Sequence, residues 1–169
     1  INRREPDTED GYSDFLVWIF NPYNGPGYFY APCGAIVVEQ RLETSGTHQG
    51  DWEHVTLRVR HGTDTEGPNV EAVYLSAHQG GKWVRYEDLL VDDDGRKMVF
   101  SALYTHAFYQ TPMRVNYCRP FGINLLFCKL SVNLVDFTAK GFKLESSNNF
   151  QELTAASSPI MTFRGRWGD

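Results

Sequence analysis

Several features that would mark a specialised class of protein are missing from this 169-residue chain. Its apolar runs fall far short of the roughly 20 residues that a membrane-spanning helix needs, and no hydrophobic leader opens the sequence, whose first residue is Ile1. Basic residues are neither in excess nor clustered, and the net charge is -5, so nucleic acid is not expected as a partner. We therefore expect a soluble protein, secreted or cytoplasmic, whose closest approach to a bilayer is peripheral contact.

Cysteine is scarce, and the common catalytic motifs are missing too. The three cysteines are Cys33, Cys118 and Cys128, and none belongs to a C-x-x-C pair. At most one disulfide can form, so neither a disulfide framework nor a cysteine zinc site is expected. The sequence has no G-x-S-x-G elbow, no Walker phosphate loop and no H-E-x-x-H helix. No familiar enzyme class is therefore indicated by motif.

What the sequence does contain is a pattern of short strands. The chain is 41% hydrophobic and 14% aromatic, which is enough for one good core. Residues 1–12 are charged and polar, as in an arm or a linker, and residues 13–169 are expected to form a single domain. Short apolar segments punctuated by Gly and Pro, with little helical periodicity, predict a mainly β fold, an antiparallel β-sandwich. One or two short helices are expected, at 85–90 and 150–156.

Two aromatic segments near the N-terminus carry more specific expectations. Residues 15–20 are apolar at every position, which predicts a strand in the centre of its sheet. The strand should end at Asn21, where a run rich in Pro and Gly begins. Tyr28 and Tyr30 lie in the next aromatic segment, 28–32, which is a candidate ligand-binding loop. The structural alternative is that these rings close one end of the sandwich.

The most informative stretch runs from Thr47 to Arg60 and alternates as a strand does. Period-two geometry places two sets of side chains on opposite faces: Asp51, Glu53, Val55, Leu57 and Val59 on one, and Trp52, His54, Thr56, Arg58 and Arg60 on the other. The apolar set should face the core, so Asp51 and Glu53 face inward with it. An inward carboxylate must be paired, protonated or bound to a metal. Pairing with an arginine such as Arg85 or Arg114 is the alternative to a metal.

Three histidines lie at predicted strand ends and could join these carboxylates. His48 precedes the alternating strand, His78 ends the strand that returns beside it, and His106 ends a later one. Antiparallel pairing would bring His78 near Asp51 and Glu53. The predicted metal ligands are His48, Asp51, Glu53 and His78. This mixed set suits Mg, Mn or Zn, and Ca if waters and carbonyls complete the shell. For each histidine alone, a hydrogen-bonded structural role is an equal alternative.

At these residues a family resemblance becomes visible. Four blocks carry it, together with the closing 163–168: residues 15–26, 48–58, 76–84 and 101–109. In this order they resemble the vacuolar protein sorting-associated protein 62 family, from about residue 12 to the end. Members are often much longer, so the chain resembles one module of them. The resemblance implies no particular chemistry.

A more distant resemblance implies more about mechanism. Residues 48–54 and 77–81 are similar to the cation-site segments of necrosis- and ethylene-inducing toxins, which are β-sandwiches related to actinoporins and fungal lectins. Those toxins hold a divalent cation and recognise glycosylated sphingolipid head groups. By position, His48, Asp51 and Glu53 match toxin cation-site residues, and His78 matches the histidine beside them. The chain departs from the toxins at Gly50, which replaces a histidine, and it lacks an upstream aspartate.

Two classes of function follow from these observations. The first is a divalent-cation-dependent binding module, cytolysin-like, that takes an anionic or glycosylated lipid head group, with Tyr28 and Tyr30 as contacts. The second is a metal-dependent hydrolase for a small-molecule substrate, in which His54, His78 or His106 serves as general acid or base. Because no catalytic motif supports the enzyme, binding is the leading hypothesis.

Overall fold

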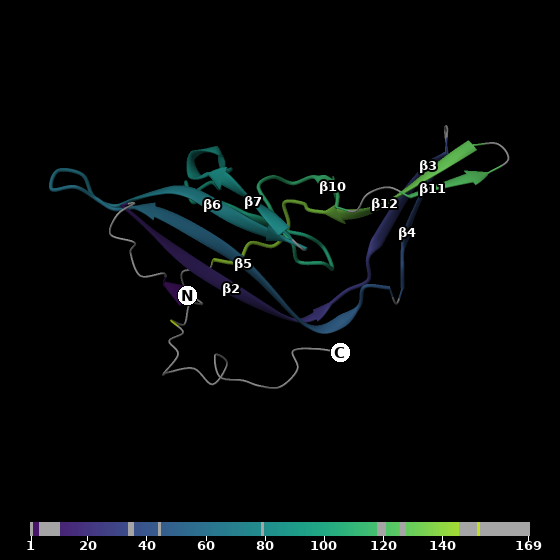
Figure 1. The fold of residues 1–169 in the computed structure, drawn as a ribbon, viewed down its shortest axis with the longest axis horizontal. Helices are drawn as coiled ribbons and strands as arrows, with labels where there is room; N and C mark the ends of the chain where they lie inside the picture. Colours follow the sequence, from purple (N-terminus) through teal and green to yellow (C-terminus); the bar gives the residue numbers. More distant parts are fainter. Residues whose placement is uncertain are drawn as a thin grey trace.

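Two antiparallel sheets follow one another along the longest axis of the molecule (Figure 1). The computed structural model describes residues 2–3, 11–33, 36–43, 45–78, 80–117, 121–125, 128–145 and 152. The first sheet has the order β1-β2-β5-β6-β7. Its strands are β1 (Asn2–Arg3), β2 (Tyr12–Asn24), β5 (His48–Arg60), β6 (Asn69–Ala77) and β7 (Gly80–Arg85).

The second sheet extends from one end of the first (Figure 1). Its order is β10-β12-β3-β4, and a further strand, β11, pairs with β12. The strands are β3 (Tyr28–Cys33), β4 (Ile36–Arg41), β10 (Arg114–Asn116), β11 (Phe121–Leu125) and β12 (Cys128–Phe137). A small ladder joins β8 (Phe100–Ser101) to β9 (Phe108–Tyr109).

The prediction of a mainly β, antiparallel fold is confirmed. Every strand pair among the described residues is antiparallel. The predicted helical turn at 85–90 is a short 3-10 helix, Tyr86–Asp88, whereas the 150–156 candidate lies outside the described residues apart from Glu152. No helix in the described ranges is long and apolar enough to cross a membrane. Two antiparallel sheets are compatible with a sandwich-like arrangement, and the likeness to the toxin fold stays a prediction.

The alternation predicted for β5 places the core correctly. The main cluster consists of buried side chains from the first sheet, from the end of the 3-10 helix and from β9: Val55, Val73, Leu75, Val84, Leu89 and Phe108. Leu57 packs against this cluster, so the face that carries Asp51 and Glu53 does point inward. A second cluster, Ala102, Ala107 and Tyr109, continues the core toward β10.

Two expectations for the N-terminal third were wrong. The strand at 15–20 does not end at Asn21 but continues to Asn24, in one register with β5 up to the pair Asn24 and His48. Pro22 interrupts a single rung, because it lacks only its own N–H and the residues on either side of it still pair. The strand is also less central than expected, since β1 covers only Phe15 and Leu16.

The proposed loop at 28–32 is strand β3, paired with both β4 and β12. Tyr28 packs edge-on against Phe137, with ring centroids 5.0 Å apart. Tyr30 supports the guanidinium of Arg114, which lies 3.9 Å from its ring centroid. The structural alternative therefore describes the local packing of these rings better than a recognition loop does.

Candidate functional site

The site lies where β5 and β6 separate. The ladder between them runs from the pair Arg60 and Asn69 to the pair Val55 and Leu75. Beyond Val55, no further residues of the two strands pair among those that the structure describes. At the next position a side chain takes over: the backbone N–H of His54 donates to Ser76 Oγ at 3.0 Å, and the Ser76 hydroxyl donates to Glu53. Beyond this point β5 stays with β2, and β6 stays with β7.

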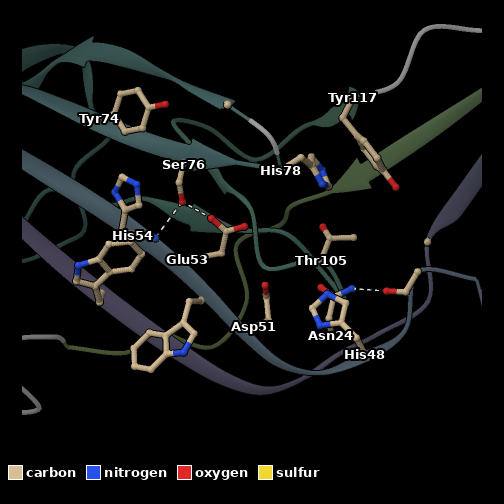
Figure 2. Close-up of a pocket in the computed structure, with 15 residues that line it drawn as sticks. Asn24, His48, Asp51, Glu53, His54, Tyr74, Ser76, His78, Thr105 and Tyr117 are labelled. Carbon is tan, nitrogen blue, oxygen red and sulfur yellow. Dashed lines mark hydrogen bonds between the residues drawn. The ribbon is translucent and has the colours of Figure 1, made fainter. Parts of the chain in front are cut away.

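The separation opens a pocket of about 730 Å³ (Figure 2). Because the sheet is parted here, side chains from both of its faces reach the cavity. Trp18, Trp52 and Tyr74 contribute aromatic walls, whereas Asp51 and Glu53 contribute carboxylates. A volume of this size is typical of small-molecule sites, which fall between about 300 and 1,000 Å³.

The two carboxylates in the pocket differ in environment. Glu53 is 7% exposed, and burial raises the pKa of its carboxyl; the hydrogen bond from Ser76 opposes that rise and the negative charge of Asp51 adds to it. Asp51 is less buried, and its Oδ2 lies 2.9 Å from Nδ1 of His106. Each carboxylate thus has a protein partner on one side and the pocket on the other.

A third carboxylate organises the far wall. Asp136, from β12, is 1% exposed. It accepts hydrogen bonds from Thr105 Oγ1 at 2.6 Å and from the Tyr109 hydroxyl at 2.6 Å, and its Oδ2 lies 2.7 Å from His78 Nε2. Burial and the adjoining Asp136 raise the pKa of Tyr109. His78 has a left-handed backbone, with φ at 53°, so a strained turn and a buried anion together fix its ring at the pocket wall.

The same ring is stacked on Tyr117. The two centroids are 3.7 Å apart and the planes are 21° from parallel. Because Tyr117 follows β10 and His78 follows β6, this contact joins the two sheets. It leaves the pocket bounded by a rigid aromatic and imidazole wall (Figure 2).

A family model described as vacuolar protein sorting-associated protein 62 matches residues 5–168, which is nearly the whole chain. The chain belongs to the Vps62 family. It is 27% identical to vacuolar protein sorting-associated protein 62 of Saccharomyces cerevisiae over 191 residues, covering 96% of this chain and 36% of that protein. It is 28% identical over 194 residues to TDA6 of the same yeast, whose name also refers to vacuolar protein sorting, with the same coverage. No solved structure matches.

The Vps62-family chain thus spans little more than a third of the length of these two relatives. Both matches cover the strands that build the pocket, since they extend over 96% of the chain. Family membership confirms the first resemblance. It does not by itself identify a ligand.

The Vps62-family pocket brings together all four predicted metal ligands. His48, Asp51, Glu53 and His78 line the same cavity. The alternative prediction, that an arginine such as Arg85 or Arg114 pairs with the two carboxylates, is wrong. Arg85 forms salt bridges with Glu87 and Asp88, and Arg114 forms one with Glu39. The partners are instead His106 and Ser76.

The arrangement does not, however, form a ready-made cation site. Within the described ranges, no three His, Cys, Asp or Glu side chains are placed to share one ion. His48 Nδ1 lies 3.2 Å from the carbonyl oxygen of Gly50, and His78 faces Asp136. The donors implied by the toxin resemblance are present but do not converge. Cation binding stays a prediction.

The catalytic candidates differ in what surrounds them. His54 lies on the face opposite the carboxylates, as predicted, stacked on Tyr74 at 5.6 Å and tilted against Trp18 at 4.7 Å. Burial lowers the pKa of His54, which favours its neutral form. His78 and His106 each face a carboxylate and are the better placed of the three. Tyr28 and Tyr30 are not among the residues that line the pocket.

Three important residues were missed by the sequence reasoning. Asp136 lies in the apolar run from Leu134 to Phe137, and a lone carboxylate in such a run is the signal that could have drawn attention to it. Ser76 and Tyr117 carry no comparable signal. Their roles depend on where β6 parts from β5 and where β10 ends.

Proposed function

We propose that this Vps62-family chain is a binding module whose pocket takes the glycosylated head group of a lipid. The observation that carries the proposal is the pocket at the β5–β6 separation, where two carboxylates and three aromatic side chains, Trp18, Trp52 and Tyr74, line one cavity. Sugars present both kinds of surface, with hydroxyl groups around the edge of the ring and C–H groups on its faces.

The polar side of the pocket is rich in acceptors. Asp51 and Glu53 offer carboxylate oxygens, which accept hydrogen bonds from hydroxyl groups. On the other side, Trp18 and Trp52 meet edge to face, with centroids 6.4 Å apart and planes at 83°, so their ring faces point in different directions. A flat apolar ring face can cover the C–H face of a sugar. Few, well-placed polar groups beside aromatic walls are typical of selective small-molecule sites.

Charge favours a neutral head group over an anionic one. A phosphate or carboxylate placed beside Asp51 and Glu53 would meet like charge in a partly buried site, where Coulomb repulsion is poorly screened. An anionic head group would therefore need a cation between it and these carboxylates. The divalent cation predicted from the toxin resemblance, Mg, Ca, Mn or Zn, would have this bridging role.

The test is a vesicle co-sedimentation assay. The protein is mixed with phosphatidylcholine vesicles that contain glucosylceramide, phosphatidylserine or neither, each with EDTA and with added Ca. We expect binding to the glucosylceramide vesicles in EDTA, and its loss in Asp51→Asn and in Trp52→Ala. Asp64→Asn, in the exposed turn between β5 and β6, is the matched control.

Three outcomes separate the alternatives. Equal binding to all vesicles, unaffected by Asp51→Asn, would contradict the proposal. Binding to phosphatidylserine only with Ca would replace it with cation-dependent recognition of an anionic head group. Binding to glucosylceramide only with Ca would mean that recognition of the glycan requires a bound cation.

A hydrolase is the second candidate, favoured by one observation. His78 and His106 each lie within 3 Å of an aspartate, at 2.7 and 2.9 Å. A carboxylate that orients a histidine is the usual support for a general base. Turnover of glycoside, ester or phosphodiester substrates that is lost in His78→Gln and His106→Gln would favour this function over binding alone.

A further inference from the structure

A second cavity lies behind the wall that bounds the polar pocket. Its volume is about 750 Å³, and apolar side chains from four strands line it: Leu75, Phe108, Val115 and Leu134. The two cavities share His78, Gly80 and Tyr117 as lining residues. They are therefore neighbours on either side of the His78–Tyr117 stack.

The two cavities have opposite chemistry. The first presents Asp51 and Glu53, whereas the second presents aliphatic and aromatic carbon with Lys82 near its edge. Lys82 and Gly80 belong to β7, an edge strand of the first sheet, and both are exposed. The apolar cavity thus reaches the surface at this edge.

The shared wall is narrow. It consists of two stacked rings and of Gly80, which has no side chain and meets no atom within 4 Å where a Cβ would lie. Asp136 holds His78 from the inside at 2.7 Å. Gly80 therefore adds no side chain to the boundary that the two cavities share, and this is the place at which one ligand would extend from the polar pocket into the apolar cavity.

We propose that the two cavities are the two halves of one site for a single amphiphile, with a glycosylated head at Asp51 and Glu53 and the first part of an apolar chain against Val115 and Leu134. This inference rests on the proposed function and deepens it. The first part of the lipid chain enters the protein beside the head group, so the contact extends beyond the head group that a membrane surface displays. Burial of the chain supplies affinity, and the carboxylates and rings supply selectivity.

The experiment compares ligands that differ only in their chain. Methyl and octyl glycosides of glucose, galactose and mannose are titrated into the protein by calorimetry, the octyl compounds below their micelle-forming concentrations. Each buried methylene should tighten binding by about fourfold, so we expect an octyl glycoside to bind more than about tenfold tighter than its methyl counterpart. Val115→Thr should reduce this ratio and leave the affinity for the methyl glycoside unchanged.

A matched variant and a free alcohol complete the design. Val91→Thr makes the same change at a position that is 52% exposed and outside both cavities, and it should leave the ratio unchanged. Octanol tests whether the apolar cavity works without a head group. Asp51→Asn should weaken methyl and octyl glycosides by the same factor.

The outcomes distinguish the two proposals. If methyl and octyl glycosides bind equally, the head-group site stands and the two-cavity inference is overturned. If octanol binds as well as the octyl glycosides and Asp51→Asn has no effect, the apolar cavity acts alone and both proposals are wrong. If no glycoside of either series binds, the proposed function fails and the inference fails with it.

Discussion

At the scale of single residues, the buried carboxylate of Asp136 connects the two sheets. It lies on β12 of the second sheet and accepts from Thr105 and Tyr109, while His78 at the end of β6 faces it. A charge this deeply buried is tolerated only because several donors surround it. Replacing the carboxylate with an amide would turn one of its two acceptor oxygens into a donor.

Asp136→Asn should therefore lower the free energy of unfolding by roughly 3 kcal/mol, because its amide NH2 would replace a buried oxygen that accepts a hydrogen bond and would face a donor. Urea denaturation measures the loss. Asp93→Asn, in an exposed turn, is the control and should be near neutral. A loss no larger than that of the control would mean that Asp136 is dispensable for the junction of the sheets.

Glu53 makes a prediction about pH. Burial raises the pKa of its folded-state carboxyl above that of the unfolded chain, about 4.3. Its proton therefore stabilises the fold fully below the unfolded pKa, and this contribution is lost as the pH rises through the raised folded pKa. Above that window the ionised Glu53 costs stability.

Glu53→Gln stays neutral and can still accept from Ser76. Its free energy of unfolding relative to the parent should therefore rise between pH 4 and pH 7, by about 1.4 kcal/mol for each unit by which the pKa of Glu53 is raised. Chemical denaturation at several pH values measures this difference. Glu43→Gln, at an exposed position, should show no such trend; a flat profile for both variants would argue against a raised pKa.

At the scale of elements, strand β5 was predictable and its partners were less so. The alternation from Asp51 to Val59 is a local signal, and it correctly placed Glu53 with Val55 on the inner face. The separation of β5 from β6 is not local, because Ser76 replaces a backbone rung across 22 residues of sequence. The pocket could therefore not be derived from the strands alone.

The prolines explain the errors in the first third of the chain. The Pro- and Gly-rich run from Asn21 was interpreted as the end of a strand, yet Pro22 lies within β2. Pro32 likewise lies within β3, in the segment that was interpreted as a loop. Proline removes a single donor, and a long ladder with partners on either side of it loses only that rung. The positions of His48 and His78 were easier to predict. His48 begins β5 and His78 follows β6, and these two strands are antiparallel neighbours, so both histidines lie beside the pocket.

The link between the two sheets depends on close backbone approach at Gly25. Its N–H donates to the carbonyl of Tyr104 at 2.8 Å, and a Cβ at Gly25 would lie 2.8 Å from Cβ of Tyr104. Tyr104 itself has a left-handed backbone, with φ at 74°. Gly25 is buried, and the two residues cannot separate without breaking this hydrogen bond.

Gly25→Ala should therefore destabilise the protein by about 1 to 3 kcal/mol, the usual cost of forcing an extra carbon into a packed site. Thermal denaturation measures the effect. Gly67→Ala is the matched control, because no atom lies within 4 Å of the position of its Cβ. Equal melting temperatures for the two variants would show that the link adapts to the extra carbon.

At the scale of the whole molecule, the chain is a small part of the proteins that it resembles. It covers 36% of each of the two yeast relatives, so activities of those proteins need not belong to this part. What this part offers is a polar pocket at the parting of one sheet and an apolar cavity beside it.

The melting temperature of the whole domain tests the cation. A ligand that binds only the folded state stabilises it by about 2.7 kcal/mol at a hundredfold excess over its Kd. In the described arrangement Asp51 is engaged by His106 and Glu53 by Ser76, and no third donor converges on them. A cation in the pocket would therefore meet two carboxylates without a third protein ligand, among the described residues, that converges with them. We therefore expect EDTA, Mg, Ca, Mn and Zn each to leave the melting temperature of the parent unchanged.

The opposite result would be equally informative, because the toxin resemblance implies it. A rise in melting temperature with one of these ions, lost in Asp51→Asn and kept in Asp64→Asn, would mean that Asp51 binds the metal. The carboxylates would then provide most of the attraction for a hard ion, and His48→Ala would weaken the rise without removing it. Differential scanning fluorimetry with and without chelator, followed by elemental analysis of the purified protein, decides between a cation held by this pocket and a pocket that works through its own side chains.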